Sequence, residues 1–297
     1  MNETLTRFLS GVVYVALLLF ATSYSEYSFF ALFGVFLLIA IYEFGQLMQL
    51  NKIASILVGG AAYFSIVYFR TPKINQSIAE IIKPISNQNS DWKFLGRIEL
   101  YILLITIFTS IKGLILLFNT TKNSLGTGSK YLYLLGYIIL PFIIITQIPY
   151  GIKGYNPKII ISIFILIWTN DTFAYIVGKS IGKHKLLETI SPKKTIEGFV
   201  GGVIFSVVAG YLISRFYFDP NPKHIERSIF IWTISALIIS IFSTLGDLIE
   251  SKFKRMAGVK DSGKIMPGHG GILDRLDSII FVAPFVFLFY QILYYVS

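Results

Sequence analysis

Acidic, hydroxyl and amino side chains recur at helical spacing near the C-terminal end of the chain. They are Asp247, Glu250, Ser251 and Lys254, at positions i, i+3, i+4 and i+7. On a helix these positions share one face. The preceding residues are apolar, so we place this face where a helix leaves hydrocarbon, and carboxylates there need a cation or a cavity. Carboxylate and hydroxyl oxygens are the ligands that a hard cation such as Mg²⁺ prefers.

A glycine-rich segment, 260–271, follows this helix. Its glycines and Pro267 predict a turn-rich loop whose backbone amides can approach phosphate oxygens. The loop leads to Asp274 and Asp277, which lie three positions apart and would share a face of the next helix. An antiparallel helix pair joined by this loop would bring Asp247 and Asp274 together around a metal ion. The alternative is a solvated hairpin whose charges only pair with one another, but that alternative does not require the glycines.

A second polar cluster begins at Asp171, within or at the end of an apolar run. Further along, Ser191 and Pro192 predict the N-cap and first residue of a helix. Lys193 and Lys194 would then lie on its first turn, where free amides favour anions. This arrangement predicts a phosphate or pyrophosphate site. Lysines that merely anchor a cytoplasmic loop are an equally good interpretation from physics alone.

The composition indicates a membrane protein. The 297 residues are 54% hydrophobic and only 14% charged, whereas a soluble domain carries about 25% charged residues. The chain has no cysteine, which excludes disulfides and thiolate metal sites. The net charge of +10 comes from short loops between apolar runs. We interpret it as positive-inside bias with contact to anionic lipid or phosphate, and we expect no nucleic-acid binding.

The elements that carry these residues are predicted to be membrane-spanning helices, each of which needs about 20 largely apolar residues. We expect an all-α, polytopic membrane helix bundle with about nine such helices. The apolar runs are Leu5–Ser23, Tyr27–Met48, Ile53–Phe69, Ile98–Phe118, Tyr131–Tyr150, Ile159–Val177, Phe199–Phe218, Ser228–Ile249 and Ile279–Val296. We expect the first run to be a retained helix, with a signal peptide as the alternative. The polar stretch Arg70–Arg97 is interpreted as an exposed loop.

The domain prediction is a single integral membrane domain over residues 1–297. Within it, residues 1–150 would be helices of a scaffold and residues 155–297 the catalytic half. Lys and Arg concentrate in the two loops 179–194 and 252–275. Two spans separate these loops, so both must face the same side, which the positive-inside rule identifies as cytoplasmic.

The segment Ser251–Asp277 resembles the signature of the phosphatidate cytidylyltransferase family, also called CDP-diacylglycerol synthases. The resemblance rests on Ser251-Lys-Phe-Lys-Arg, on Lys260-Asp261, and on His269-Gly-Gly-Ile-Leu-Asp-Arg-Leu-Asp. The segments around Asp171 and Lys193 also resemble family motifs. The resemblance implies a transferase that forms CDP-diacylglycerol and pyrophosphate from CTP and phosphatidate in phospholipid biosynthesis.

The family also implies roles for individual residues. Catalytic roles would belong to Asp247, Ser251, Lys254 and Asp274. Mg²⁺, and K⁺ as a further candidate, would be held by Asp247, Ser251 and Asp274, with Lys254 facing a phosphate. Substrate binding would involve Asp171, Lys193, Lys194, Lys260, Asp261, His269, Arg275 and Asp277. We expect a multi-pass protein of the inner cell membrane with its active site at the cytoplasmic face, and a homodimer is one alternative for its assembly.

Some alternatives stay open at this point. His269 could act as a base, but we favour a loop histidine that binds backbone or phosphate, because a dianionic phosphate nucleophile needs no base. Arg275 could clamp a phosphate or neutralise the neighbouring carboxylates. A related lipid-nucleotide enzyme, of the CDP-archaeol synthase or polyprenol kinase type, is the second hypothesis. An ion-coupled transporter that uses Asp171 and Asp247 is the third.

Overall fold

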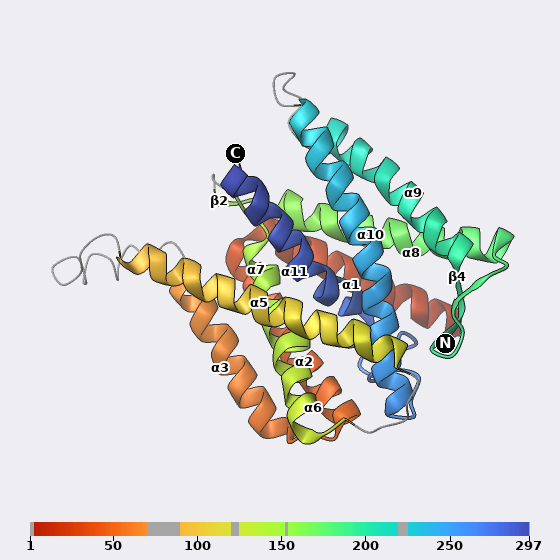
Figure 1. Cartoon of the computed structure of the whole chain (residues 1–297), viewed down its shortest axis with the longest axis horizontal. Helices are drawn as coiled ribbons and strands as arrows, with labels where there is room; N and C mark the ends of the chain where they lie inside the picture. The colour runs from red at the N-terminus through yellow and green to blue at the C-terminus, as the bar shows by residue number, and fades with distance from the viewer. Residues whose placement is uncertain (1–2, 71–89, 120–124, 152–153, 219–224, 297) are drawn as a thin grey trace.

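Long helices dominate the fold, as Figure 1 shows for the computed structural model. The structure describes residues 3–70, 90–119, 125–151, 154–218 and 225–296. Among these residues, eight helices are long and apolar enough to cross a membrane, and the apolar stretch Lys52–Val67 is shorter. The prediction of an all-α, polytopic membrane bundle is therefore confirmed. Most of the predicted Arg70–Arg97 loop lies outside the described residues, but its end is helical from Ser90 onward.

The N-terminal half supplies five of the predicted runs. Its elements are α1 (Glu3–Tyr24), α2 (Glu26–Met48), α3 (Lys52–Arg70), α5 (Ser90–Phe118), α6 (Thr127–Tyr133), the π-helix η1 (Leu134–Ile139) and α7 (Leu140–Gln147). Helices α6, η1 and α7 are continuous and form one span. The serine between α1 and α2 explains why they separate: Ser25 caps α2 by accepting a hydrogen bond from the Ser28 backbone N–H.

The C-terminal half alternates helices with two short hairpins. Its elements are β1 (Tyr150–Gly151), β2 (Gly154–Tyr155), α8 (Pro157–Ile181), β3 (Lys185–Leu187), β4 (Ser191–Thr195), α9 (Ile196–Leu212), the π-helix η2 (Ile213–Tyr217), α10 (Ile225–Met256) and α11 (Leu273–Val296). Both hairpins are antiparallel: Tyr150 pairs with Tyr155 in the first, and Lys185 with Thr195 in the second.

The predicted helix start at Ser191 is wrong. Residues Ser191–Thr195 form strand β4, and α9 begins at Ile196 with Thr195 as its N-cap. The Thr195 hydroxyl accepts from the Gly198 backbone N–H at 3.1 Å, so the cap that we assigned to Ser191 is supplied four residues later. Pairing with β3 satisfies the intervening backbone, which removes the need for a helix there.

Close packing of α10 against α11 fixes the helix pair that carries the acidic residues. At Gly246 an added Cβ would lie 2.9 Å from the Asp277 carbonyl oxygen, so only glycine permits this approach. An aromatic cluster lies behind it: the Phe253 ring on α10 packs edge-on against Phe44 and Tyr137, with ring centroids 5.4 Å apart in both pairs. The pair is thereby held against α2 and η1.

Several element ends meet at one end of the bundle. The start of α1 contacts the loop before α11, where the Ser10 hydroxyl donates to the Pro267 carbonyl at 3.0 Å. Strand β4 meets α10 through Lys194 and Asp247. In Figure 1 the N-terminus lies beside β4, whereas the C-terminus lies at the opposite end near β2. The polar segments that carry Asp171, Lys194, Asp247 and the glycine-rich loop therefore converge on one side.

Candidate functional site

The four residues at helical spacing share one face of α10, as predicted. The Ser251 hydroxyl donates to Asp247 Oδ1 at 3.3 Å, and the Lys254 ammonium forms an ion pair with Glu250. Glu250 is fully buried and Lys254 nearly so. Glu250 and Lys254 therefore face the protein interior, whereas Asp247 stays partly exposed.

Three carboxylates gather where α10 meets α11. Asp247 and Glu250 from α10 and Asp277 from α11 each place a carboxylate oxygen within 4.8 Å of the other two. Asp277 and Glu250 are buried, while Asp247 is partly exposed. Three carboxylates this close repel one another unless a cation lies between them or protons are bound. Oxygen ligands from three carboxylates, with the Ser251 hydroxyl beside them, suit Mg²⁺.

Asp274 lies outside this acidic group, and both of its carboxylate oxygens accept hydrogen bonds from other groups of the protein. Its Oδ1 accepts from Lys254 Nζ at 2.7 Å. Its Oδ2 accepts from the backbone N–H groups of Ser262 at 2.9 Å and Gly271 at 2.7 Å. The Ser262 hydroxyl also donates to Oδ2 at 3.0 Å. Asp274 thus fastens the glycine-rich loop to α11, and its predicted role as a metal ligand stays a prediction.

Lys194 comes from the β3–β4 hairpin and reaches the acidic group. Its Nζ lies 2.6 Å from Asp247 Oδ2. Lys193 lines the same pocket as Lys194. The two lysines therefore lie beside the carboxylates, although a strand positions them and not the first turn of a helix.

A large pocket of about 720 Å³ joins these groups. Its lining includes the basic side chains of Lys179, Lys185, Lys193 and Lys194. It also includes the acidic side chains of Asp171, Asp247, Asp261, Asp274 and Asp277. Lys254 and Arg275 lie among them. A pocket of this volume is in the range of small-molecule sites, about 300–1,000 Å³, and its charges suit a polyanion together with cations.

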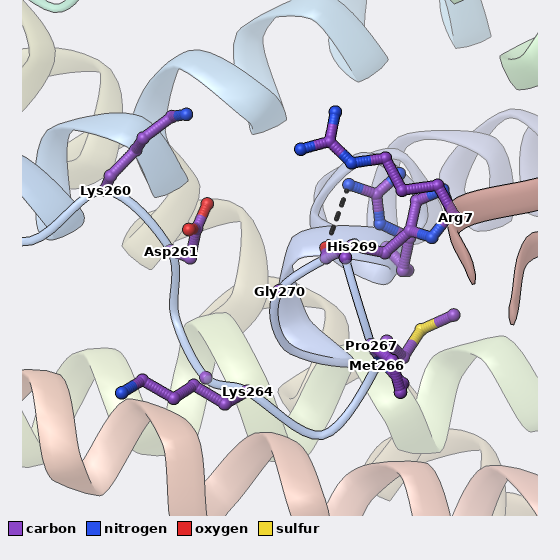
Figure 2. A pocket seen from close by; sticks show the side chains of 11 residues that line it. Arg7, Lys260, Asp261, Lys264, Met266, Pro267, His269 and Gly270 are labelled. Atoms are coloured by element: carbon purple, nitrogen blue, oxygen red, sulfur yellow. Dashed lines mark hydrogen bonds between the residues drawn. The ribbon is translucent and has the colours of Figure 1, made fainter. Parts of the chain in front are cut away.

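A second, basic pocket of about 510 Å³ lies on the α1 side of the glycine-rich loop. Figure 2 shows Lys260 and Lys264 on one limb of the loop, with Asp261 between them and Arg7 reaching in from α1. Arg275 also lines this pocket, and its guanidinium donates to the His269 carbonyl at 3.3 Å. With one acidic residue among these cations, the pocket favours an anion.

His269 joins the loop to α1. Its Nδ1 lies 2.7 Å from the Ser10 hydroxyl. Burial, with Arg275 and Arg7 nearby, lowers the pKa of the His269 imidazole below its usual value. The neutral ring is the form expected at pH 7, so His269 contributes a hydrogen-bonding group and not a fixed positive charge.

A third pocket, which we call the α1–α8 groove, has a volume of about 250 Å³. Its walls come from α1, α8 and the start of α11. Its lining combines apolar and aromatic residues with the polar residues Asp171, His269, Asp274, Arg275, Asp277 and Ser278. All the site residues predicted from the sequence therefore line at least one of the three pockets, except Ser251, which lies beside Asp247.

Glu43 on α2 is a residue of the site that was not predicted from the sequence. Its side chain is 1% exposed, and its carboxylate accepts from the backbone N–H groups of Ile272 at 3.1 Å and Leu273 at 2.8 Å. The Ser262 hydroxyl donates to it as well, at 3.2 Å. Glu43 therefore caps α11 from a distant helix. An acidic residue inside an apolar run was the available signal, since such residues default to function.

Residues of α1 were missed as well. Arg7 lines the basic pocket, while Gly11 and Tyr14 line the α1–α8 groove. No spacing pattern in the sequence links them to the C-terminal segment, because only the folded bundle brings α1 beside α8 and α11. The division into a scaffold and a catalytic half stays a prediction, but α1 and α2 both contribute side chains to the site.

Comparisons with known proteins add family-level evidence. The sequence model described as "Cytidylyltransferase family" matches residues 5–293. A phosphatidate cytidylyltransferase of Staphylococcus haemolyticus is 36% identical over 247 residues, which cover 83% of this chain and 85% of that protein. Proteins of the same name are 51% identical over 123 residues in Staphylococcus saprophyticus (41% of this chain, 44% of that protein) and 46% identical over 135 residues in Staphylococcus epidermidis (46% and 50%).

Proposed function

The chain belongs to the cytidylyltransferase family, and from that premise we propose that it forms CDP-diacylglycerol and pyrophosphate from CTP and phosphatidate. The names of the three relatives support phosphatidate as the acceptor. The helices that can cross a membrane support a lipid substrate. Neither the transporter nor the related lipid-nucleotide enzymes receive comparable support.

The observation that carries this proposal is the large pocket, which combines lysines and carboxylates around one space. In the reaction, a phosphate oxygen of phosphatidate bonds to the α-phosphorus of CTP, and the bond from that phosphorus to the bridging oxygen of the β-phosphate breaks. A phosphate monoester is mostly dianionic at pH 7, with a second pKa near 6. The main obstacle is repulsion between two polyanions, which positioning and neutralisation of charge overcome.

The lysines of the β3–β4 hairpin are suited to the triphosphate. Lys193 and Lys194 enter the large pocket from β4, and Lys179 enters it from α8. Their ammonium groups neutralise phosphate oxygens and stabilise the charge that develops on pyrophosphate as it leaves. When a triphosphate occupies the pocket, we expect the Lys194 contact to Asp247 to yield to phosphate.

The acidic group fits the Mg²⁺ that the family resemblance implies. Asp247, Glu250 and Asp277 supply closely spaced hard oxygen ligands, with the Ser251 hydroxyl beside Asp247. A bound Mg²⁺ would supply Lewis-acid stabilisation of phosphate charge. Lys254 holds Glu250 and Asp274 in place through its ion pairs. K⁺ at the same site and a homodimer stay predictions.

The site is proposed to face the cytoplasm, where CTP is available. The basic loops that flank it support this orientation through the positive-inside rule. The bacterial relatives support a location in the cell membrane.

The proposed activity is tested with purified enzyme in mixed micelles of detergent and phosphatidate. CTP labelled at its α-phosphate and Mg²⁺ are supplied, and labelled CDP-diacylglycerol is extracted and measured together with pyrophosphate. We expect equal amounts of both products, and none when phosphatidate is replaced by diacylglycerol. A folded wild-type enzyme that releases neither product would refute the proposal.

A further inference from the structure

The α1–α8 groove differs in chemistry from the other two pockets. On α1 it is lined by Gly11, Tyr14 and Val15, and on α8 by Phe164, Ile167 and Trp168. Its remaining lining residues are mostly polar or charged, as described above. A cavity lined by both apolar and charged residues suits an amphiphile, whereas the lysines and arginines of the large pocket and the basic pocket suit a soluble polyanion.

The groove and the large pocket share the residues at which two substrates would have to meet. Asp171, Asp274, Arg275, Asp277 and Ser278 line both. A ligand in either pocket therefore reaches the same acidic junction from a different side. Transfer of the cytidylyl group of CTP onto the phosphate of phosphatidate requires this arrangement, because that phosphate and the α-phosphate of CTP must meet at one reacting centre.

The volume of the groove limits how much of a lipid it can hold. Its 250 Å³ is below the range of about 300–1,000 Å³ typical of small-molecule sites. A glycerol phosphate headgroup fits this size better than a complete lipid, so the acyl chains would have to lie outside. The surface beside the groove can accept them, since Val12 on α1 is 49% exposed and faces the bilayer if α1 spans it.

Tyr14 provides an independent observation that points to a ligand. Its side chain is 8% exposed, and its hydroxyl is buried without a hydrogen-bond partner among the described residues. Burying a hydroxyl without a hydrogen-bond partner is unfavourable, so its retention calls for an explanation. A phosphate or glycerol oxygen in the groove could accept a hydrogen bond from the Tyr14 hydroxyl.

From these observations, and resting on the proposed function, we propose that phosphatidate enters between α1 and α8 and places its phosphate headgroup in the α1–α8 groove. CTP then occupies the large pocket on the other side of the junction. In this arrangement α1 is a wall of the lipid site and not only scaffold. Tyr14 is a binding residue for the headgroup.

The test separates the Michaelis constants of the two substrates. Tyr14→Phe removes only the hydroxyl, and we expect it to raise the KM for phosphatidate roughly three- to tenfold, the effect of one hydrogen bond. The KM for CTP should not change. The melting temperature should stay the same or rise, because the hydroxyl loses no partner within the fold.

A second variant narrows the groove, with a matched control. Val15→Trp should raise the KM for phosphatidate by about fivefold or more through overpacking, while Val13→Trp, on the exposed face of the same helix, should leave it unchanged. An unchanged KM for phosphatidate in Tyr14→Phe, or an increase in the KM for CTP instead, would overturn the groove assignment. Those results would not contradict the proposed reaction. That proposal fails only if the wild-type enzyme makes no CDP-diacylglycerol.

Discussion

Lys254 shows how one side chain can organise the charges of a site. It lies between Glu250 and Asp274, and it is almost completely buried. A buried ammonium is stable only when carboxylates and hydrogen bonds replace its hydration. Lys254 therefore compensates part of the negative charge. Since Asp247 pairs with Lys194, Asp277 is the carboxylate of the acidic group that most needs another cation.

The division between metal-binding and structural carboxylates can be measured. We expect Asp277→Asn to raise the Mg²⁺ concentration for half-maximal rate by about 10–100-fold, since changes at metal sites and their supporting shells have effects of this size. Asp274→Asn should mainly lower the free energy of unfolding, by about 1–3 kcal/mol, because it weakens the hydrogen bonds that this side chain accepts from backbone N–H groups of the loop. Mg²⁺ titrations of the rate and melting curves distinguish the two. The opposite pattern would favour the metal ligands predicted from the sequence.

His269 predicts a pH dependence of stability. Its pKa is lowered in the folded protein, mainly by burial, so the unfolded chain takes up a proton first as the pH falls below the usual value of about 6.5. Stability should therefore decrease as the pH falls from about 6.5 until the folded state is protonated too. Melting temperatures from pH 7.5 to 5 should fall less steeply in His269→Gln. An identical slope in both proteins would contradict this assignment.

At the scale of elements, the beginning of α11 depends on α2. Helix starts leave backbone N–H groups without partners, and at α11 the Glu43 carboxylate accepts two of them from another helix. The same carboxylate accepts from the hydroxyl of Ser262 in the glycine-rich loop. The position of Asp277, one turn into α11, is thus linked to a helix more than 200 residues earlier in the chain.

Removing this link should affect both folding and turnover. Glu43→Gln replaces one acceptor oxygen with a donor, so we expect about 1–3 kcal/mol of destabilisation. We also expect roughly 100-fold slower turnover, because displaced catalytic groups have effects of this size. Glu26→Gln, at the opposite end of α2, is the control and should have little effect on kcat. Retained kcat in Glu43→Gln, measured at a temperature where the variant is folded, would show that α2 does not position the site.

At the scale of the whole molecule, the ends of α1, α8, α10 and α11 meet on one side together with the β3–β4 hairpin. The functional groups of the site come from both halves of the chain. This common side must also be the cytoplasmic side if CTP is to reach the large pocket. The orientation of the bundle in the membrane is therefore part of the proposed function.

The absence of cysteine makes this orientation directly measurable. We expect Lys183→Cys and Arg255→Cys to react with a membrane-impermeant maleimide only after intact cells are permeabilised, because the positive-inside rule predicts that their basic loops face the cytoplasm. Lys158→Cys, at the start of α8 and on the opposite side, should react in intact cells. The reverse labelling pattern would place the site outside the cell.

The sequence by itself determined the membrane class, the helical bundle and the segments that carry chemistry. Apolar runs of the length of a bilayer leave the backbone no alternative to helices, and charged residues at their borders are too costly to be incidental. Helical spacing was enough to place Asp247, Glu250, Ser251 and Lys254 on one face of α10, because that relation is local.

Only the tertiary structure decided which carboxylates face one another and which helices complete the site. Asp277, and not Asp274, lies with Asp247 and Glu250, because the donors that occupy Asp274 come from a folded loop. Glu43 and Tyr14 belong to the site through contacts that join distant parts of the chain, and no local pattern encodes such contacts. The strand at Ser191 was missed for the same reason: pairing with β3 outweighed a sequence that favours a helix start.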